Sequence, residues 1–264
     1  FSVSYNFDVG SWEKPGLCFA LDLAQRSGTA TNSNESLKKT LSNLGVEMSV
    51  QCSDHRTSVN VSGLDDAMEE ALALVQEWLS QVVIEDEALE NAKQTTIGVR
   101  RDNLASPRFL GWALNSYGRW GQESAFLHQL SDEGLKALGR DQVQALARGL
   151  FSYQREVRYF GPRKTQEVRP LLQRSDKLQP TKRREANRCR RVQRPTIYFV
   201  HRDVAKSSVS ITVPRVPGDE GERAAADLWS NYLSGGMGGL IFQEVREARG
   251  LAYSAYAYVS TGSY

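Results

Sequence analysis

The sequence predicts an α+β fold built from two similar α/β-sandwich domains, each a mostly antiparallel sheet with helices packed on it. Helical patterns alternate with hairpin-like strands rather than with the regular βαβ units of a parallel sheet. A basic stretch that contains prolines divides the 264 residues. The order of strands and helices then starts again. We therefore expect residues 1–165 to form one domain, 166–195 a linker, and 196–264 the start of a second, truncated domain.

The first domain is expected to begin with a mostly apolar helix at residues 15–26, which Gly28 ends. A short amphipathic helix follows at 35–44. Residues 46–52 and 57–61 alternate between apolar and polar side chains, which predicts a β-hairpin that turns at 53–55. The rest of this domain is expected to contain helices at 65–80, 86–102, 106–118, 131–138 and 141–150, and a closing strand at 155–161.

The linker at 166–195 is rich in basic side chains, namely Lys182, Arg183, Arg184, Arg188, Arg190, Arg191 and Arg194. We interpret it as a solvated connection between domains. Nucleic-acid binding is the alternative, because basic runs contact phosphates, but no aromatic side chain interleaves this run for base stacking. Beyond the linker we expect strands at 196–201 and 207–213, a helix at 220–233, a glycine-rich loop, a helix at 243–249 and a strand at 251–261.

The composition is that of an ordinary globular protein, with 40% hydrophobic residues, 24% charged residues and a net charge of +2. No apolar run approaches the ~18 residues of a membrane span, and the N-terminus shows no secretory leader pattern. Cys18, Cys52 and Cys189 show neither CxxC spacing nor an even-numbered framework. We therefore expect Cys18 and Cys52 to be small buried apolar side chains. The three histidines are too far apart in sequence to suggest a local metal site.

The closing segment carries the most specific pattern. Residues 234–254 read SGGMGGLIFQEVREARGLAYS, in which a glycine-rich loop enters a charged helix that stops at Gly250. This order resembles the second domain of the insulinase/pitrilysin zinc metallopeptidases, the inverzincins whose active helix carries H-x-x-E-H. Gly16-Leu17 and Gly28-Thr29 have the separation found around that helix in the family. The resemblance therefore covers nearly the whole chain and implies two insulinase-like domains.

The chain departs from the family at the zinc motif itself. The positions of the first histidine, the glutamate and the second histidine hold Phe19, Asp22 and Leu23. Phe19 and Leu23 have no lone pair for zinc, and Asp22 is one methylene shorter than the family's general base. The family's third ligand, a glutamate, would fall near residues 96–100, which contain none. We expect this helix to be an apolar packing helix, with no zinc bound by this chain and zinc held by a catalytic partner half.

The resemblance implies a substrate-binding role for Arg249 and Tyr253, which would reach toward a peptide bound at the partner's zinc. Arginine offers a fork of donors, and a tyrosine hydroxyl can donate to a carbonyl or an oxyanion. From the residues alone, Arg249 could simply cap the helix and Tyr253 could be a core aromatic. We expect the glycine-rich loop to let a peptide or a neighbouring backbone approach closely, through its four glycines, Gly235, Gly236, Gly238 and Gly239.

Together these features predict a non-catalytic domain or subunit of a pitrilysin-type zinc metalloendopeptidase, with no peptidase activity by itself. It would pair with an H-x-x-E-H-bearing half and enclose peptide substrates. A purely structural scaffold subunit of a larger complex is the alternative, and nucleic-acid binding through residues 182–194 is a third hypothesis. The compartment stays open between bacterial cytoplasm, periplasm and mitochondrial matrix.

Overall fold

The computed structural model describes residues 1–172, 178–181, 194–203, 207–213 and 220–259. The chain divides into two compact units, which are described separately. The first unit comprises Phe1–Tyr117, Gly121–Glu185 and Phe199–Ser208, and the second comprises Gly118–Trp120, Ala186–Tyr198 and Val209–Tyr264. Among the described residues, no helix is both long enough and apolar enough to cross a bilayer.

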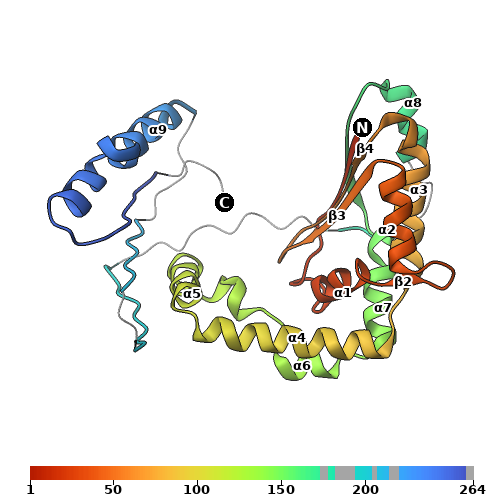
Figure 1. Ribbon diagram of the computed structural model, residues 1–264, viewed down its shortest axis with the longest axis horizontal. Coiled ribbons are helices and arrows are strands. Elements are labelled where there is room, and N and C mark those ends of the chain that lie inside the picture. The colour runs from red at the N-terminus through yellow and green to blue at the C-terminus, as the bar shows by residue number, and fades with distance from the viewer. Residues whose placement is uncertain (173–177, 182–193, 204–206, 214–219, 260–264) are drawn as a thin grey trace. The chain divides into compact units, whose positions relative to one another are not determined.

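The first unit is organised around a four-stranded sheet in the order β3-β4-β1-β6 (Figure 1). All neighbouring strands in it are antiparallel, which confirms the predicted sheet type. The strands are β1 (Ser2–Phe7), β3 (Val46–Cys52), β4 (Thr57–Gly63) and β6 (Arg155–Phe160). A small second sheet pairs β2 (Gly28–Thr29) with β5 (Val82–Val83). β3 stands at one end of the strand order and is therefore an edge strand.

Strand β1 was not predicted, although its sequence carries the usual signal. Val3, Tyr5 and Phe7 alternate with polar residues and are all buried. Tyr5 pairs with Val59 of β4 on one side and with Val157 of β6 on the other. This two-residue period is the pattern of a half-buried strand.

Helices pack on the sheet because this contact buries their apolar faces away from water. The core combines these stripes with the inward side chains of the strands. The helices are α1 (Leu17–Ala24), α2 (Asn34–Asn43), α3 (Met68–Gln81), α7 (Arg140–Arg148) and α8 (Thr165–Leu172). Ser33 caps α2 by accepting a hydrogen bond from the N–H of Ser36. At the centre, the buried indole of Trp78 on α3 donates to the carbonyl of Ser27 at 2.9 Å.

A series of helices extends from this core (Figure 1). It consists of α4 (Asp86–Ala105), α5 (Pro107–Trp120) and α6 (Asp132–Ala137), together with the short turns η2 (Gly121–Glu123) and η3 (Ala125–Leu127). Two further turns, η1 (Asp65–Ala67) and η4 (Leu150–Ser152), precede α3 and β6. The predicted helices of this region are therefore confirmed, with shifts of a few residues at their ends.

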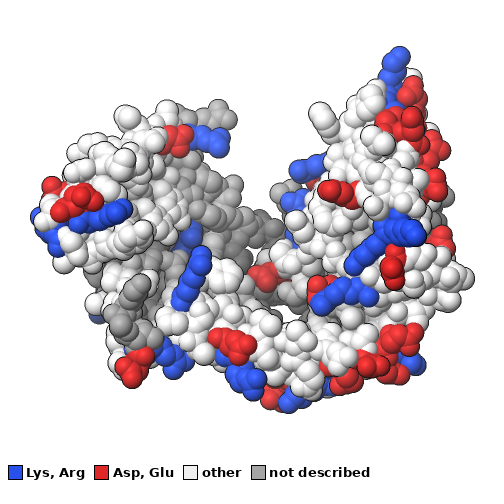
Figure 2. All heavy atoms as spheres, viewed as in Figure 1, with Lys and Arg blue, Asp and Glu red and all other residues white. Residues whose placement is uncertain are grey.

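The first residues of the predicted linker belong to the first unit, since α8 occupies 165–172 and buries Val168 in its core. The basic residues Lys182, Arg183, Arg184, Arg188, Arg190 and Arg191 lie outside the described residues. On the face of the described surface that Figure 2 shows, acidic and basic side chains are interspersed.

The second unit contains α9 (Glu220–Ser234), the turn η5 (Gly236–Gly238) and the π-helical turn η6 (Phe242–Glu247). The strands predicted at 196–201, 207–213 and 251–261 are wrong for the residues described there, none of which joins a strand. A strand needs a neighbour's N–H and C=O groups. Around residues 251–259, the N–H groups of Ala257 and Val259 are bound instead by the hydroxyls of Ser234 and Ser230 on α9.

Candidate functional site

The helix that corresponds to the zinc motif is α1, and its motif positions face two different environments. Leu23 is buried in the core and Phe19 packs against it. Asp22 is exposed and forms an ion pair with Arg26 one turn later. Phe19 and Leu23 offer no donor atom, and the Asp22 carboxylate is already paired, so these residues do not fit a zinc ion. The prediction that this is a packing helix agrees with the burial of its apolar side chains, Leu17, Ala20, Leu21, Leu23 and Ala24.

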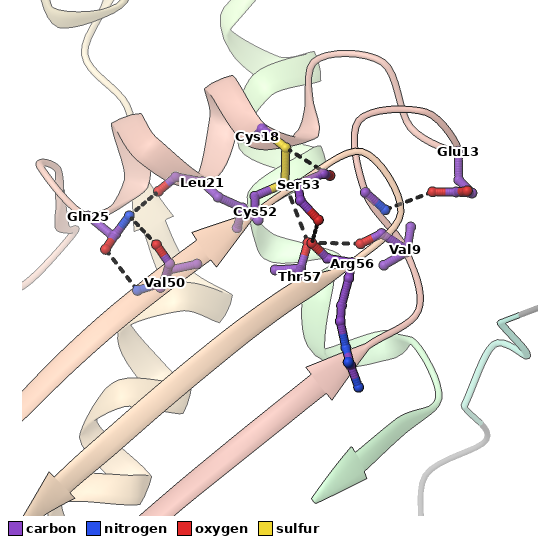
Figure 3. The surroundings of a disulfide bond; sticks show 11 residues. Val9, Glu13, Cys18, Leu21, Gln25, Val50, Cys52, Ser53, Arg56 and Thr57 are labelled. Atoms are coloured by element: carbon purple, nitrogen blue, oxygen red, sulfur yellow. Dashed lines mark hydrogen bonds between the residues drawn. A yellow bond between two sulfur atoms is a disulfide. The ribbon is translucent and has the colours of Figure 1, made fainter. Parts of the chain in front are cut away.

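Beside Phe19, the prediction for the cysteines is wrong. Cys18 of α1 and Cys52 at the end of β3 form a disulfide, with their Cα atoms 5.2 Å apart (Figure 3). Both side chains are half-buried rather than enclosed. The error arose because the bonded pair is 34 residues apart. Such a distance carries no local spacing signal, and only the packing of α1 against the hairpin brings the two residues together.

An open cavity of about 670 Å³ lies next to Asp22, between α1, α2 and β3. Its wall combines charged groups of both signs, Asp22, Arg26, Lys38 and Glu47, with the apolar side chains of Leu41, Val46, Met48 and Trp78. Sequence reasoning did not find this cavity, because its wall comes from four elements, α1, α2, β3 and α3, and its residues form no motif.

In the second unit, the glycine-rich loop is tight against the end of α9. Gly235 donates to the carbonyl of Asn231 at 2.6 Å, and a Cβ atom at Gly235 would lie 2.3 Å from that same oxygen. A Cβ atom at Gly239 would lie 3.0 Å from backbone atoms of residues 233–235. Gly236 has a φ of +69°, which favours glycine. Three of the four glycines are thus required by the local backbone, while Gly238 has open space around its Cα.

Arg249 follows η6 and is joined to it by two contacts. Its Nη1 donates to the carbonyl of Glu244 at 2.8 Å and to the carboxylate of Glu244 at 2.6 Å. The side chain is nevertheless 57% exposed. Gly250 comes next with a φ of +59° and donates to the carbonyl of Arg246 at 2.9 Å, which ends the helical turn. Arg249 therefore caps this turn and keeps Nη2 and Nε without a partner among the described residues.

Tyr253 is not a core aromatic, because it is 87% exposed. Its ring is held by Arg246, whose guanidinium lies 5.1 Å from the centre of the Tyr253 ring and 4.8 Å from that of Phe242. A guanidinium placed over an aromatic face is attracted to the ring. Sequence reasoning missed Arg246, although its spacing of seven residues from Tyr253 lies inside the recognised segment.

Comparison with known proteins assigns the family. The description "Insulinase (Peptidase family M16)" matches residues 7–107, and "Peptidase M16 inactive domain" matches residues 141–264. The chain belongs to peptidase family M16. Its M16 membership confirms the resemblance of the closing segment, and residues 249–253 lie within the part that matches the inactive domain.

Curated relatives match over a short part of the chain. An uncharacterized zinc protease of Streptomyces coelicolor is 38% identical over 64 residues, and one of Mycobacterium bovis is 44% identical over 64 residues. These alignments cover 24% of this chain and 14% of each relative. The chain thus spans a small fraction of the length of these relatives.

Solved structures share the fold over most of the chain. The peptidase M16 inactive domain from Pseudomonas fluorescens superposes with a TM-score of 0.64 at 17% identity, covering 97% of this chain and 64% of that one. The periplasmic protease PqqL from Escherichia coli gives 0.63 at 19% identity, covering 97% and 29%. The ferredoxin protease FusC, a mutant in complex with Arabidopsis ferredoxin, gives 0.60 at 13% identity, covering 71% and 22%.

Proposed function

We propose that this chain is a non-catalytic part of an M16 peptidase that pairs with a zinc-bearing half and binds peptide substrate. The observation that carries the proposal is the contrast between its two motif regions. On α1, Phe19 and Leu23 are built into the apolar core and offer nothing to zinc. In the second unit, Arg249 and Tyr253 keep exposed polar groups in a segment that matches the M16 inactive domain.

Arg249 is suited to hold a peptide while it stays attached to η6. A guanidinium has five N–H groups, and the two contacts to Glu244 both use Nη1. The Nη2 and Nε groups can therefore donate to a peptide carbonyl or to a terminal carboxylate. The capping contact and substrate binding are compatible, because Glu244 fixes the direction in which the remaining donors point.

Tyr253 is suited to act beside it. The stacking of Arg246 on one ring face restrains the ring without using the hydroxyl, which can donate to a carbonyl. The peptide-binding role is supported by the family and by the chemistry of these side chains. The ferredoxin protease FusC, crystallised with a ferredoxin, has the same fold, which supports a polypeptide as the substrate class.

The proposal predicts how the purified chain behaves alone. Metal analysis by mass spectrometry should find no stoichiometric zinc after dialysis, and a fluorogenic unstructured peptide should not be cleaved. One tightly bound zinc per chain, or cleavage that a chelator abolishes, would contradict the assignment as a non-catalytic part.

Substrate contact is tested separately in the complex with a zinc-bearing M16 half. Arg249→Ala should lower kcat/KM roughly tenfold to a hundredfold, as expected when a charge-assisted hydrogen bond is lost. Tyr253→Phe removes only the hydroxyl and should lower kcat/KM by about tenfold. Arg223→Ala, an exposed cation on α9, is the matched control and should leave cleavage unchanged. If both variants cleave the peptide as fast as the wild type, Arg249 and Tyr253 do not contact the substrate, and the chain has a structural role only.

A further inference from the structure

The outer edge of the main sheet is contacted near the end of β3 by Cys18 of α1 and by Gln25, the residue that ends this helix. β3 is an edge strand, and an edge strand presents unpaired N–H and C=O groups that can pair with another chain. At Val50 and Cys52, however, the side chains of Gln25 and Cys18 occupy this edge (Figure 3).

The side chain of Gln25 takes the place of a neighbouring strand. Its Oε1 accepts from the backbone N–H of Val50 at 3.0 Å, and its Nε2 donates to the carbonyl of Val50 at 3.4 Å. A primary amide offers the same donor and acceptor as a peptide group. The outward-facing backbone groups of Val50 are therefore both satisfied without another strand.

The disulfide and two backbone contacts continue this closure toward the hairpin turn. Cys52, two residues after Val50, is bonded to Cys18. The N–H of Ser11 then donates to the carbonyl of Ser53 at 3.1 Å, and that of Trp12 donates to the carbonyl of Asp54 at 2.9 Å.

The spacing of Cys18 and Gln25 on the helix matches the spacing of Cys52 and Val50 on the strand. Gln25 is seven residues after Cys18, about two helical turns, so the two side chains leave the same face of α1. Val50 and Cys52 are two residues apart and therefore equivalent along the strand. One face of α1 is thus attached to one strand edge by a covalent bond at one end and an amide at the other.

We propose that α1 acts as a clamp that closes the β3 edge against strand addition at Val50 and Cys52, and that the Cys18–Cys52 disulfide holds the clamp shut. Disulfides persist in oxidising compartments and are rare in the cytosol, so the closed state belongs to an oxidising compartment. A dithiol reductant opens it: two electrons and two protons pass to the two sulfurs, two thiols form, and the reductant becomes a cyclic disulfide. Both cysteines are partly exposed, which gives the reductant access.

Residue-resolved amide hydrogen exchange tests the clamp in the full chain, with dithiothreitol as the reductant. Reduction should raise the exchange rate of the Val50 N–H by about tenfold or more. The central strand β1 should keep its slow exchange, with the amide of Tyr5 about a hundredfold slower than that of Val50, because its pairing with β4 and β6 does not depend on the clamp. The double variant Cys18→Ser with Cys52→Ser should reproduce the reduced state without reductant.

Two glutamine variants separate the clamp from a general loss of stability. Oxidised Gln25→Ala should speed exchange at Val50, since the accepting amide is gone. Gln144→Ala is the matched control, because Gln144 Oε1 accepts from the N–H of Ile84 at 2.9 Å elsewhere in the unit. It should speed exchange at Ile84 and leave Val50 unchanged. The proposal is wrong if Val50 exchanges equally fast in the oxidised and reduced chain, or if reduction brings Val50 and Tyr5 to the same rate.

Discussion

Removal of the Cys18–Cys52 disulfide should be among the more costly changes to this chain. The bond joins residues 34 apart. In the chain-entropy treatment, closing a loop of that size in the unfolded state contributes about 4 kcal/mol at 25 °C. We therefore expect the double variant Cys18→Ser with Cys52→Ser to lower the free energy of unfolding by about 3–4 kcal/mol.

Urea denaturation followed by circular dichroism measures this difference. The wild type and the double variant are compared without reductant and then with dithiothreitol. Their midpoints should differ clearly in the first condition and nearly coincide in the second, because reduction removes the same bond from the wild type. A difference below about 1 kcal/mol without reductant would refute the reasoning, and so would a difference that persists after reduction.

Three smaller changes test the local arguments, each by urea denaturation. Trp78→Phe removes the donor to a buried carbonyl and should cost about 1–3 kcal/mol, whereas Trp112→Phe on the exposed side of α5 should cost less than about 0.5 kcal/mol. Asp22→Asn removes an exposed ion pair and should change stability by less than about 1 kcal/mol. Gly250→Ala places a Cβ at a φ of +59° and should cost about 1 kcal/mol, while Gly238→Ala, with open space around it, should cost less.

The helices of the first unit could be predicted because their signal is local. In α2, Leu37 and Leu41 repeat at the helical period and are buried, and Ser33 supplies the cap. The same local reasoning identified the β3–β4 hairpin, whose register pairs Val50 with Val59. Strand β1 shows the same alternation and could have been found by the same rule.

The strands predicted in the second unit failed for a physical reason. Val209, Ile211 and Val213 alternate with polar residues, as strand residues do, but each is more than 80% exposed in the structure. Alternation expresses a preference for a half-buried surface, and it forms a strand only where a neighbouring strand and a covering layer are present. Within the described residues of this unit, backbone donors near Val259 reach serine hydroxyls of α9 instead.

In the candidate site too, features carried by a contiguous segment could be predicted from the sequence, whereas features that depend on tertiary packing could not. The identity of Arg249 and Tyr253 could be read from a contiguous motif, but the contacts of Arg246 with the Phe242 and Tyr253 rings could not, because they depend on how η6 ends. The disulfide and the cavity beside Asp22 were missed for a related reason. The disulfide joins α1 to β3, and the cavity is lined by these two elements together with α2 and α3, all of which are separated in sequence.

The changes on α1 are best understood together rather than as a simple loss of ligands. Where the family's active helix directs histidines toward zinc, this helix buries Leu23 and packs Phe19. Its neighbouring face carries Cys18 and Gln25, which attach it to the sheet edge. A helix fixed in this way needs no metal to hold its position, because a covalent bond and a pair of amide hydrogen bonds fix it instead. The same face that holds α1 in place also covers the β3 edge at Val50 and Cys52, so structural anchoring and protection of this part of the edge are two effects of the same residues.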